Sequence, residues 1–167
     1  LANQNKDFKI YHTDINIKML EQGQRKIIDH GKIVSSLVCD AEKIPFPTNY
    51  FDCVTIAFGL RNITRKEKAL SEMLRVLSPG GKLVILEFSK IWSPLSKIYD
   101  NFSFNLIPKL GKVFANDEKS YQYLVESIRV HPDQKKLKAM MEKEGFEKVS
   151  FLNLSGGIVA IHQGYKF

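Results

Sequence analysis

Short apolar runs alternate with longer stretches in which apolar residues recur every three or four positions. The short runs predict β-strands over residues 8–14, 32–40, 51–58 and 82–88. The longer stretches predict helices over residues 16–30 and 64–81. Strand and helix signals therefore alternate to about residue 88, which is typical of a doubly wound, mostly parallel α/β sheet.

The helix predicted over residues 64–81 has the clearest end signals. Thr64 and Glu67 have the spacing of a capping box, and Pro79, followed by two glycines, predicts the stop. Its expected inner face consists of Leu70, Met73, Leu74 and Leu77. Residues 16–30 predict a second helix with one apolar side, formed by Ile17, Leu20, Ile27 and Ile28.

The strand predicted over residues 51–58 is almost continuously apolar. Such a run is typical of a parallel strand that helices cover on both faces. Directly after it, the chain reads FGLRN and presents Arg61 and Asn62. Ligands of open α/β sheets bind beyond the carboxyl ends of the strands, so both residues are candidates for chemistry. A solvated loop or a helix cap is the alternative.

The pattern of apolar and polar residues changes in the last third of the chain. Aromatic, apolar and lysine residues interleave over 92–114, which indicates either an amphipathic excursion packed on the sheet or a lid over a hydrophobic ligand. Helices are predicted over 120–130 and 132–145, the second stopping at Gly145. Two strands around Gly156 and Gly157 follow, and their short connection requires them to be antiparallel. We expect one domain over 1–167, with 92–130 as a substrate-covering insertion.

Composition excludes several classes of protein. The 167 residues are 44% hydrophobic, enough for one sizeable core. Cys39 and Cys53 form no paired motif, so we expect a reducing compartment, no disulfide and no metal site. The sequence contains no run of 18 apolar residues, the length that would indicate a membrane span. The net charge of +7 permits attraction to anionic lipid, but scattered lysines without a recognition motif predict no nucleic-acid binding.

A mostly parallel sheet that ends in an antiparallel hairpin is the arrangement of the S-adenosylmethionine-dependent methyltransferases. Within that class, the chain resembles the ubiquinone/menaquinone biosynthesis C-methyltransferase family (UbiE) over essentially its whole length. The segments that carry the resemblance are DAEKIPFPTNYFDCVTIAFGLRNIT, RVLSPGGKLVILEFSK, PLSKIYDNFSF, ANDEKSYQYLVESIRVHPDQ and the terminal GYKF. The most specific signal is FGLRN, ESIRVHPDQ and GYKF in that order.

The resemblance implies a Rossmann-like class I fold, S-adenosyl-L-methionine as cofactor, and methylation of a ring carbon of a polyprenylated quinol. The expected substrates are 2-methoxy-6-polyprenyl-1,4-benzoquinol, demethylmenaquinol or both. The implied location is peripheral to the inner membrane, in a cytoplasmic or matrix-like compartment. A quinone-biosynthesis complex or a homo-oligomer is the implied assembly.

Four positions match the family's cofactor residues. Asp14 matches the acidic residue that accepts hydrogen bonds from the ribose hydroxyls, and a helix cap is its alternative role. Asp40 and Ala41 match the pair beside the adenine, and Asp40 would otherwise be a turn former. Ala57 lies where some family members carry a serine, so only a backbone contact with the cofactor is expected.

Arg61 and Asn62 are the expected catalytic residues. A quinol ring carbon becomes nucleophilic when a ring hydroxyl loses its proton, and the charge of Arg61 would stabilise the resulting phenolate. Asn62 would orient a hydroxyl or a water that carries the proton away. No general base is assigned. His131 is the best titratable candidate, and a helix-start residue before Pro132 is its alternative role.

One expected feature is missing from the start of the chain. Only thirteen residues precede Asp14, and none is glycine, so the glycine-rich cofactor loop and the first strand are absent from this sequence. We therefore expect an amino-terminally truncated portion of a longer protein, unable on its own to bind the cofactor at micromolar concentration. A noncatalytic methyltransferase-like subunit that binds a prenylated quinol or a partner enzyme is the alternative. A dinucleotide-dependent oxidoreductase is a third hypothesis, which the missing glycines disfavour.

Overall fold

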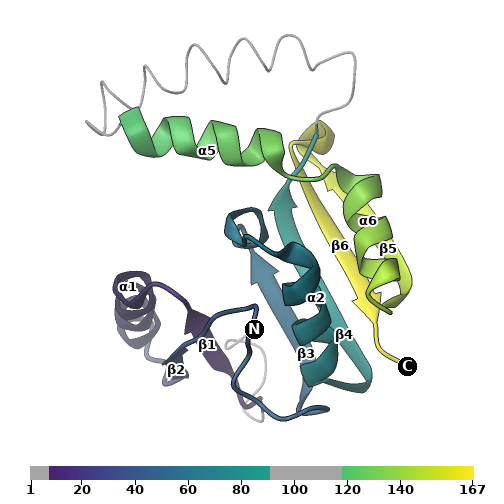
Figure 1. The fold of residues 1–167 in the computed structure, drawn as a ribbon. Helices are drawn as coiled ribbons and strands as arrows, with labels where there is room; N and C mark the ends of the chain where they lie inside the picture. The colour runs from purple at the N-terminus through teal and green to yellow at the C-terminus, as the bar shows by residue number, and fades with distance from the viewer. Residues whose placement is uncertain (1–7, 91–117) are drawn as a thin grey trace. The chain divides into compact units, whose positions relative to one another are not determined.

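The computed structural model describes residues 8–90 and 118–167 and divides into two compact units, Leu1–Pro45 and Phe46–Phe167 (Figure 1). The predicted excursion or lid over 92–114 lies outside the described residues, as does most of the predicted insertion. No helix within the described ranges is long and apolar enough to cross a bilayer. The expectation of a single domain over the whole chain stays a prediction.

The first unit is a β-α-β element. Strands β1 (Tyr11–Asp14) and β2 (Ser35–Val38) pair in parallel, and helix α1 (Ile17–Asp29) connects them. The helix begins where the side-chain oxygen of Asn16 accepts hydrogen bonds from the backbone N–H groups of the next turn.

The predicted apolar side of α1 is only partly correct. Leu20 is buried, but Ile17 and Ile28 are each 58% exposed. Two strands of four residues offer one helix too little apolar surface to cover its whole apolar side.

The second unit contains a four-stranded mixed sheet in the order β3-β4-β6-β5. Strands β3 (Phe51–Ala57) and β4 (Leu77–Phe88) are parallel, whereas β6 (Val159–Tyr165) is antiparallel to β4. Strand β5 (Glu147–Leu154) is antiparallel to β6, which confirms the predicted terminal hairpin. Its turn is the short 3-10 helix η3 (Ser155–Gly157).

Strand β3 differs from its predicted environment. It lies at the edge of the four-stranded sheet and pairs only with β4 among the described strands. Val54 and Ile56 are half-buried, whereas Cys53 and Thr55 are exposed. The prediction of burial on both faces is therefore wrong for this strand in the structure. An apolar sequence alone does not show which elements cover each face of a strand.

Helices α2 (Lys66–Val76) and α6 (Gln134–Lys143) cover one face of this sheet (Figure 1). The core between them and β4 is apolar: Ala69, Leu70, Met73, Val76, Leu83, Ile85, Leu137 and Met141. Burying each large aliphatic side chain contributes roughly 1.5–3 kcal/mol. Helix α5 (Glu118–Val130) precedes α6 and packs against the 3-10 helix η1 (Leu60–Asn62) that follows β3.

Both predicted ends of α2 need correction. Arg65, not Thr64, is the N-cap residue, and no side chain accepts a hydrogen bond there, so the predicted capping box does not form. The helix ends at Val76, before the proline and glycines, because Leu77 is already extended and pairs with Phe51 as the first residue of β4. Most of the predicted inner face is buried, and Leu74 is only half-buried.

The terminal GYKF segment closes the second unit. The Lys166 ammonium donates hydrogen bonds to the carbonyl oxygens of Leu74 and Arg75, at 2.9 and 3.2 Å, and so satisfies acceptors at the end of α2. A Cβ atom at Gly164 would lie 3.1 Å from side-chain atoms of Met141 and Phe146, so close packing of the α6 segment on β6 favours glycine there.

Candidate functional site

The carboxyl end of β3 turns sharply. Phe58 has a φ angle of 53°, a left-handed conformation that is rare for a bulky residue. Its N–H donates to the carbonyl of Leu86 at 2.8 Å, and its ring lies 4.9 Å from the ring of Phe88. Leu60, two residues later, is fully buried. These contacts hold the chain in a strained turn, and such backbone strain is concentrated at functional sites.

A buried ion pair lies beneath this turn. Glu87 is 1% exposed, and its carboxylate accepts from the Arg61 guanidinium at 3.0 Å and from the Arg61 backbone N–H at 3.1 Å. The guanidinium also donates to the carbonyl of Phe58 and lies 5.3 Å from the centre of the Phe88 ring. Arg61 therefore joins β4 to the turn after β3.

The ion pair changes what Arg61 can contribute. Its charge is largely balanced by Glu87, and no described group accepts from its buried Nε. The predicted catalytic role of Arg61 stays a prediction, and the geometry adds a structural role. Glu87 was not identified from the sequence. Its signal is a single carboxylate inside the apolar run KLVILEF, since a carboxylate is rarely buried without a partner.

Asn62 contacts a residue from a distant part of the chain. The hydroxyl of Tyr123, on α5, donates to the Asn62 side-chain oxygen at 3.1 Å. This hydrogen bond orients the amide, so that its NH₂ group remains available to donate. Asn62 is exposed, as its predicted role requires, and Tyr123 was not identified from the sequence.

His131 lies at the junction of α5 and α6. The side chain is buried, and neither ring nitrogen has a hydrogen-bond partner among the described residues. Burial, together with the nearby charges of Lys66, His162 and Arg61, lowers the pKa of His131 to about 4. The imidazole is therefore neutral at pH 7, and its low pKa makes it a weak proton acceptor there.

The predicted cofactor residues of the first unit meet at one edge. Asp14 and Asp40 follow the adjacent parallel strands β1 and β2, and the N–H of Cys39 donates to the Asp14 carbonyl at 3.0 Å. One carboxylate oxygen of Asp14 accepts from the N–H of Asn16 at 2.8 Å, and no described group donates to the other. Asn16 is the helix cap, so Asp14 is not.

Asp40 forms a turn. Its carboxylate accepts from the N–H of Glu42 at 2.8 Å, and its carbonyl accepts from the N–H of Lys43 at 3.0 Å. Asp40 itself is exposed, and Ala41 beside it is half-buried. In the second unit, Ala57 is the last residue of β3 and is exposed. Each unit thus gathers its predicted residues at the carboxyl ends of its parallel strands.

Comparison with solved structures identifies the fold class. The chain matches the crystal structure of the cyclase SpnF with a TM-score of 0.72 at 16% identity, covering 99% of this chain and 68% of that one. It matches an S-adenosylmethionine-dependent methyltransferase from Aquifex aeolicus with a TM-score of 0.67 at 19% identity, covering 97% and 71%. Identities this low show the fold alone, which confirms the predicted Rossmann-like class.

Comparison of sequences is more specific. The chain is 58% identical over 159 residues to the ubiquinone/menaquinone biosynthesis C-methyltransferase UbiE of Paraburkholderia phytofirmans. The match covers 95% of this chain and 65% of that protein, so the chain spans less than two thirds of its relative's length. The model of the ubiE/COQ5 methyltransferase family matches residues 1–166. That match includes the predicted site residues of both units. The chain therefore belongs to the ubiE/COQ5 methyltransferase family.

Proposed function

We propose that the protein carrying this chain transfers a methyl group from S-adenosyl-L-methionine to a ring carbon of a polyprenylated quinol. The proposed substrates are 2-methoxy-6-polyprenyl-1,4-benzoquinol and demethylmenaquinol. The observation that carries the proposal is the 58% identity to a UbiE C-methyltransferase across 95% of the chain. The polar residues at the carboxyl ends of β1, β2 and β3 support it, since ligands of such sheets bind there.

The first unit offers groups that fit the cofactor. Asp14 is half-buried, and its carboxylate oxygen without a described donor can accept from a ribose hydroxyl. Asp40 would accept from the adenine amino group, while Ala41 and Ala57 would contribute backbone contacts. The bound cofactor supplies a methyl group on a positively charged sulfur.

In the second unit, Asn62 is the better placed of the two predicted catalytic residues. Tyr123 holds its oxygen, so the Asn62 NH₂ group can donate to the quinol oxygen on which negative charge develops. Arg61 adds residual positive potential and, through Glu87, holds the turn that carries Asn62. Loss of the hydroxyl proton makes the ring carbon nucleophilic, and binding aligns it with the methyl group.

Asp14→Ala is expected to raise the dissociation constant of the cofactor about tenfold to a hundredfold, because a hydrogen bond to a charged acceptor is worth roughly 1.5–3 kcal/mol. Calorimetry on the natural protein would measure this affinity. Asp29→Ala, at the exposed end of α1, removes the same charge from the same unit and is the matched control. Unchanged affinity in the Asp14 variant would remove that residue from the site.

Arg61→Lys is expected to lower kcat about tenfold while KM changes less. Lysine keeps the charge but lacks the planar fork that contacts Glu87 and the Phe58 carbonyl together, so the turn carrying Asn62 is held less well. Steady-state kinetics would separate the two constants, with Arg25→Lys on the exposed part of α1 as control. A rise in KM alone would mean that Arg61 only holds substrate.

The function itself is tested by methyl transfer from isotopically labelled cofactor to each reduced quinol. Mass spectrometry should locate the label on ring carbon and not on oxygen. Quinol binding without transfer would instead support the alternative, a noncatalytic methyltransferase-like subunit. Transfer to one quinol only would assign the substrate.

We also propose a location at the periphery of the inner membrane, in a reducing compartment. A polyprenyl tail partitions into lipid, and the net charge of +7 favours an anionic surface. Cosedimentation with anionic vesicles and not with neutral ones would support this location. Assembly with other quinone-biosynthesis proteins, or with further copies, stays a prediction.

A further inference from the structure

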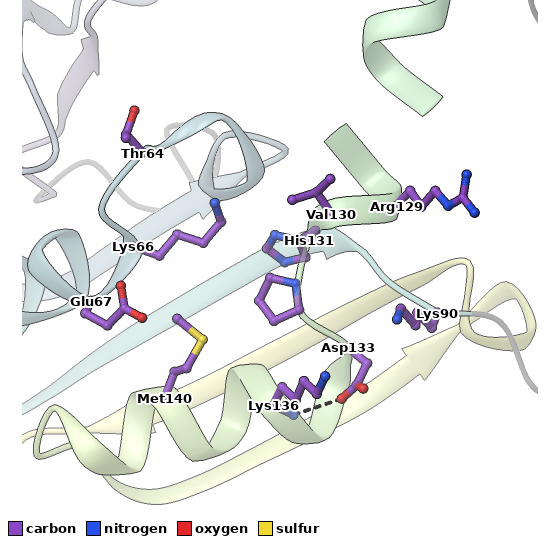
Figure 2. A pocket seen from close by; sticks show the side chains of 11 residues that line it. Thr64, Lys66, Glu67, Lys90, Arg129, Val130, His131, Asp133, Lys136 and Met140 are labelled. Carbon is purple, nitrogen blue, oxygen red and sulfur yellow. Dashed lines mark hydrogen bonds between the residues drawn. The ribbon is translucent and has the colours of Figure 1, made fainter. Parts of the chain in front are cut away.

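A pocket of about 360 Å³ lies where α5 meets α6. Figure 2 shows its lining side chains, which come from the start of α2, the segment just after β4, the α5–α6 junction and α6. We call it the His131 pocket, and its polar lining residues are Thr64, Lys66, Glu67, Lys90, Arg129, His131, Asp133 and Lys136. Neither Asn62 nor Tyr123 is among its lining residues.

The charges in the lining are unequal. Four cationic side chains face two carboxylates, a difference of two positive charges. Asp133 is already engaged, because its carboxylate accepts from the backbone N–H of Lys136 at 2.9 Å as the N-cap of α6. The ammonium of Lys66 donates to the carbonyl of Ile63 at 2.8 Å and keeps further N–H groups for another acceptor. The pocket therefore favours an anion.

His131 supplies an independent observation. Its side chain is 3% exposed, and both ring nitrogens lack a partner within the described part of the chain. A buried polar group without a partner costs roughly 1–3 kcal/mol, so a bound group that accepts from the ring N–H would be favoured. The positive charges that lower the pKa of His131 act in the same direction, because an anion would offset them.

We propose that the His131 pocket binds a phosphate-type oxyanion, which accepts hydrogen bonds from the His131 ring and from the lysines of the lining. A phosphate group carries several oxygens on one centre and can accept from more than one of the donors that line the pocket. The start of α6 adds the positive end of its helix dipole. Inorganic phosphate and the phosphodiester of a phospholipid headgroup share this chemistry. The proposal does not depend on methyl transfer.

The first test is a titration of the natural protein with inorganic phosphate at constant ionic strength, followed by NMR of the histidine ring protons. Phosphate at millimolar concentration should shift the His131 signal and raise its pKa by about one pH unit or more. The exposed His30 should respond little and is the internal reference. A His131 signal that phosphate leaves unmoved would overturn the proposal.

A matched pair of substitutions on α6 tests specificity. Lys136→Gln removes a lining charge, whereas Lys138→Gln removes an equal charge whose ammonium lies 3.6 Å from Glu142 and outside the lining. The first should weaken phosphate binding about threefold to tenfold, and the second should leave it nearly unchanged. Both are surface changes, and melting curves would confirm that each variant is folded. Equal losses would mean general attraction by a basic protein and would overturn a specific site.

A third arm distinguishes the two sources of the oxyanion. Phosphatidylglycerol vesicles should bind the Lys136→Gln variant less well than the Lys138→Gln variant if the occupant is a headgroup. Equal vesicle binding by the two variants, together with the expected phosphate response, would assign the pocket to free phosphate. No difference between the variants in either titration would refute the proposal.

Discussion

Glu87→Ala is expected to lower the free energy of unfolding of the second unit by about 3–5 kcal/mol, because it leaves the charge of Arg61 buried without its partner. The Glu87 carboxylate is 1% exposed and accepts from the side chain and backbone of Arg61 and from the backbone N–H of Phe88. Urea denaturation of the natural protein would measure the loss. Activity should fall as well, since Asn62 follows Arg61 directly.

Two further variants make the expectation specific. Replacing Glu87 and Arg61 together should recover part of the loss, because no unpaired charge remains buried. Glu142→Ala breaks the exposed pair with Lys138 and should cost at most about 1 kcal/mol. If Glu87→Ala cost no more than Glu142→Ala, the ion pair would not be holding the turn after β3.

Acidification is expected to destabilise the second unit by about 3 kcal/mol through His131 alone between pH 6.5 and 4. Burial and the charges of Lys66, His162 and Arg61 lower the pKa of His131 from its usual 6.5 to about 4 in the folded chain. Between these values the unfolded chain binds a proton that the folded chain does not. The stabilisation is therefore complete above pH 6.5 and is lost as the pH falls towards 4.

Comparison of variants isolates this contribution from that of the carboxylates. Unfolding free energies would be measured against pH in phosphate-free buffer for the natural protein, His131→Asn and His30→Gln. His131→Asn should flatten the curve between pH 6.5 and 4, and the exposed His30→Gln should not. Burial also lowers the pKa of His162. Part of the acid sensitivity should therefore remain in the His131→Asn variant. Identical slopes in all three proteins would contradict the neutral, buried state of His131.

The sequence predicted the elements whose signals are local. Apolar periodicity identified the strands β3 and β4, the helix between them and the terminal hairpin, because a two-residue or 3.6-residue period follows directly from backbone geometry. It also placed Arg61 and Asn62 at the end of a parallel strand, since a strand that stops before a glycine must present its next residues there. The motif order was sufficient to identify the family.

Signals that depend on burial were less reliable. Thr64 and Glu67 have the spacing of a capping box, yet the helix starts at Lys66 and its N-cap is Arg65. The turn before it contains the buried Leu60 and Arg61, which pairs with Glu87. Strand β3 reads as covered on both faces, yet among the described strands it pairs only with β4 and lies at the edge of its sheet.

Amino-acid order alone thus determined the strands, the helices, the family and the residues at the strand ends. Tertiary structure alone decided what those residues contact. Arg61 meets Glu87 across 26 positions, and Asn62 meets Tyr123 across 61. The pKa of His131 is lowered because the fold buries the ring and brings Lys66 and His162 near it. Charge, pKa and hydrogen-bond partners depend on distance in space, and no local period in a sequence encodes that distance.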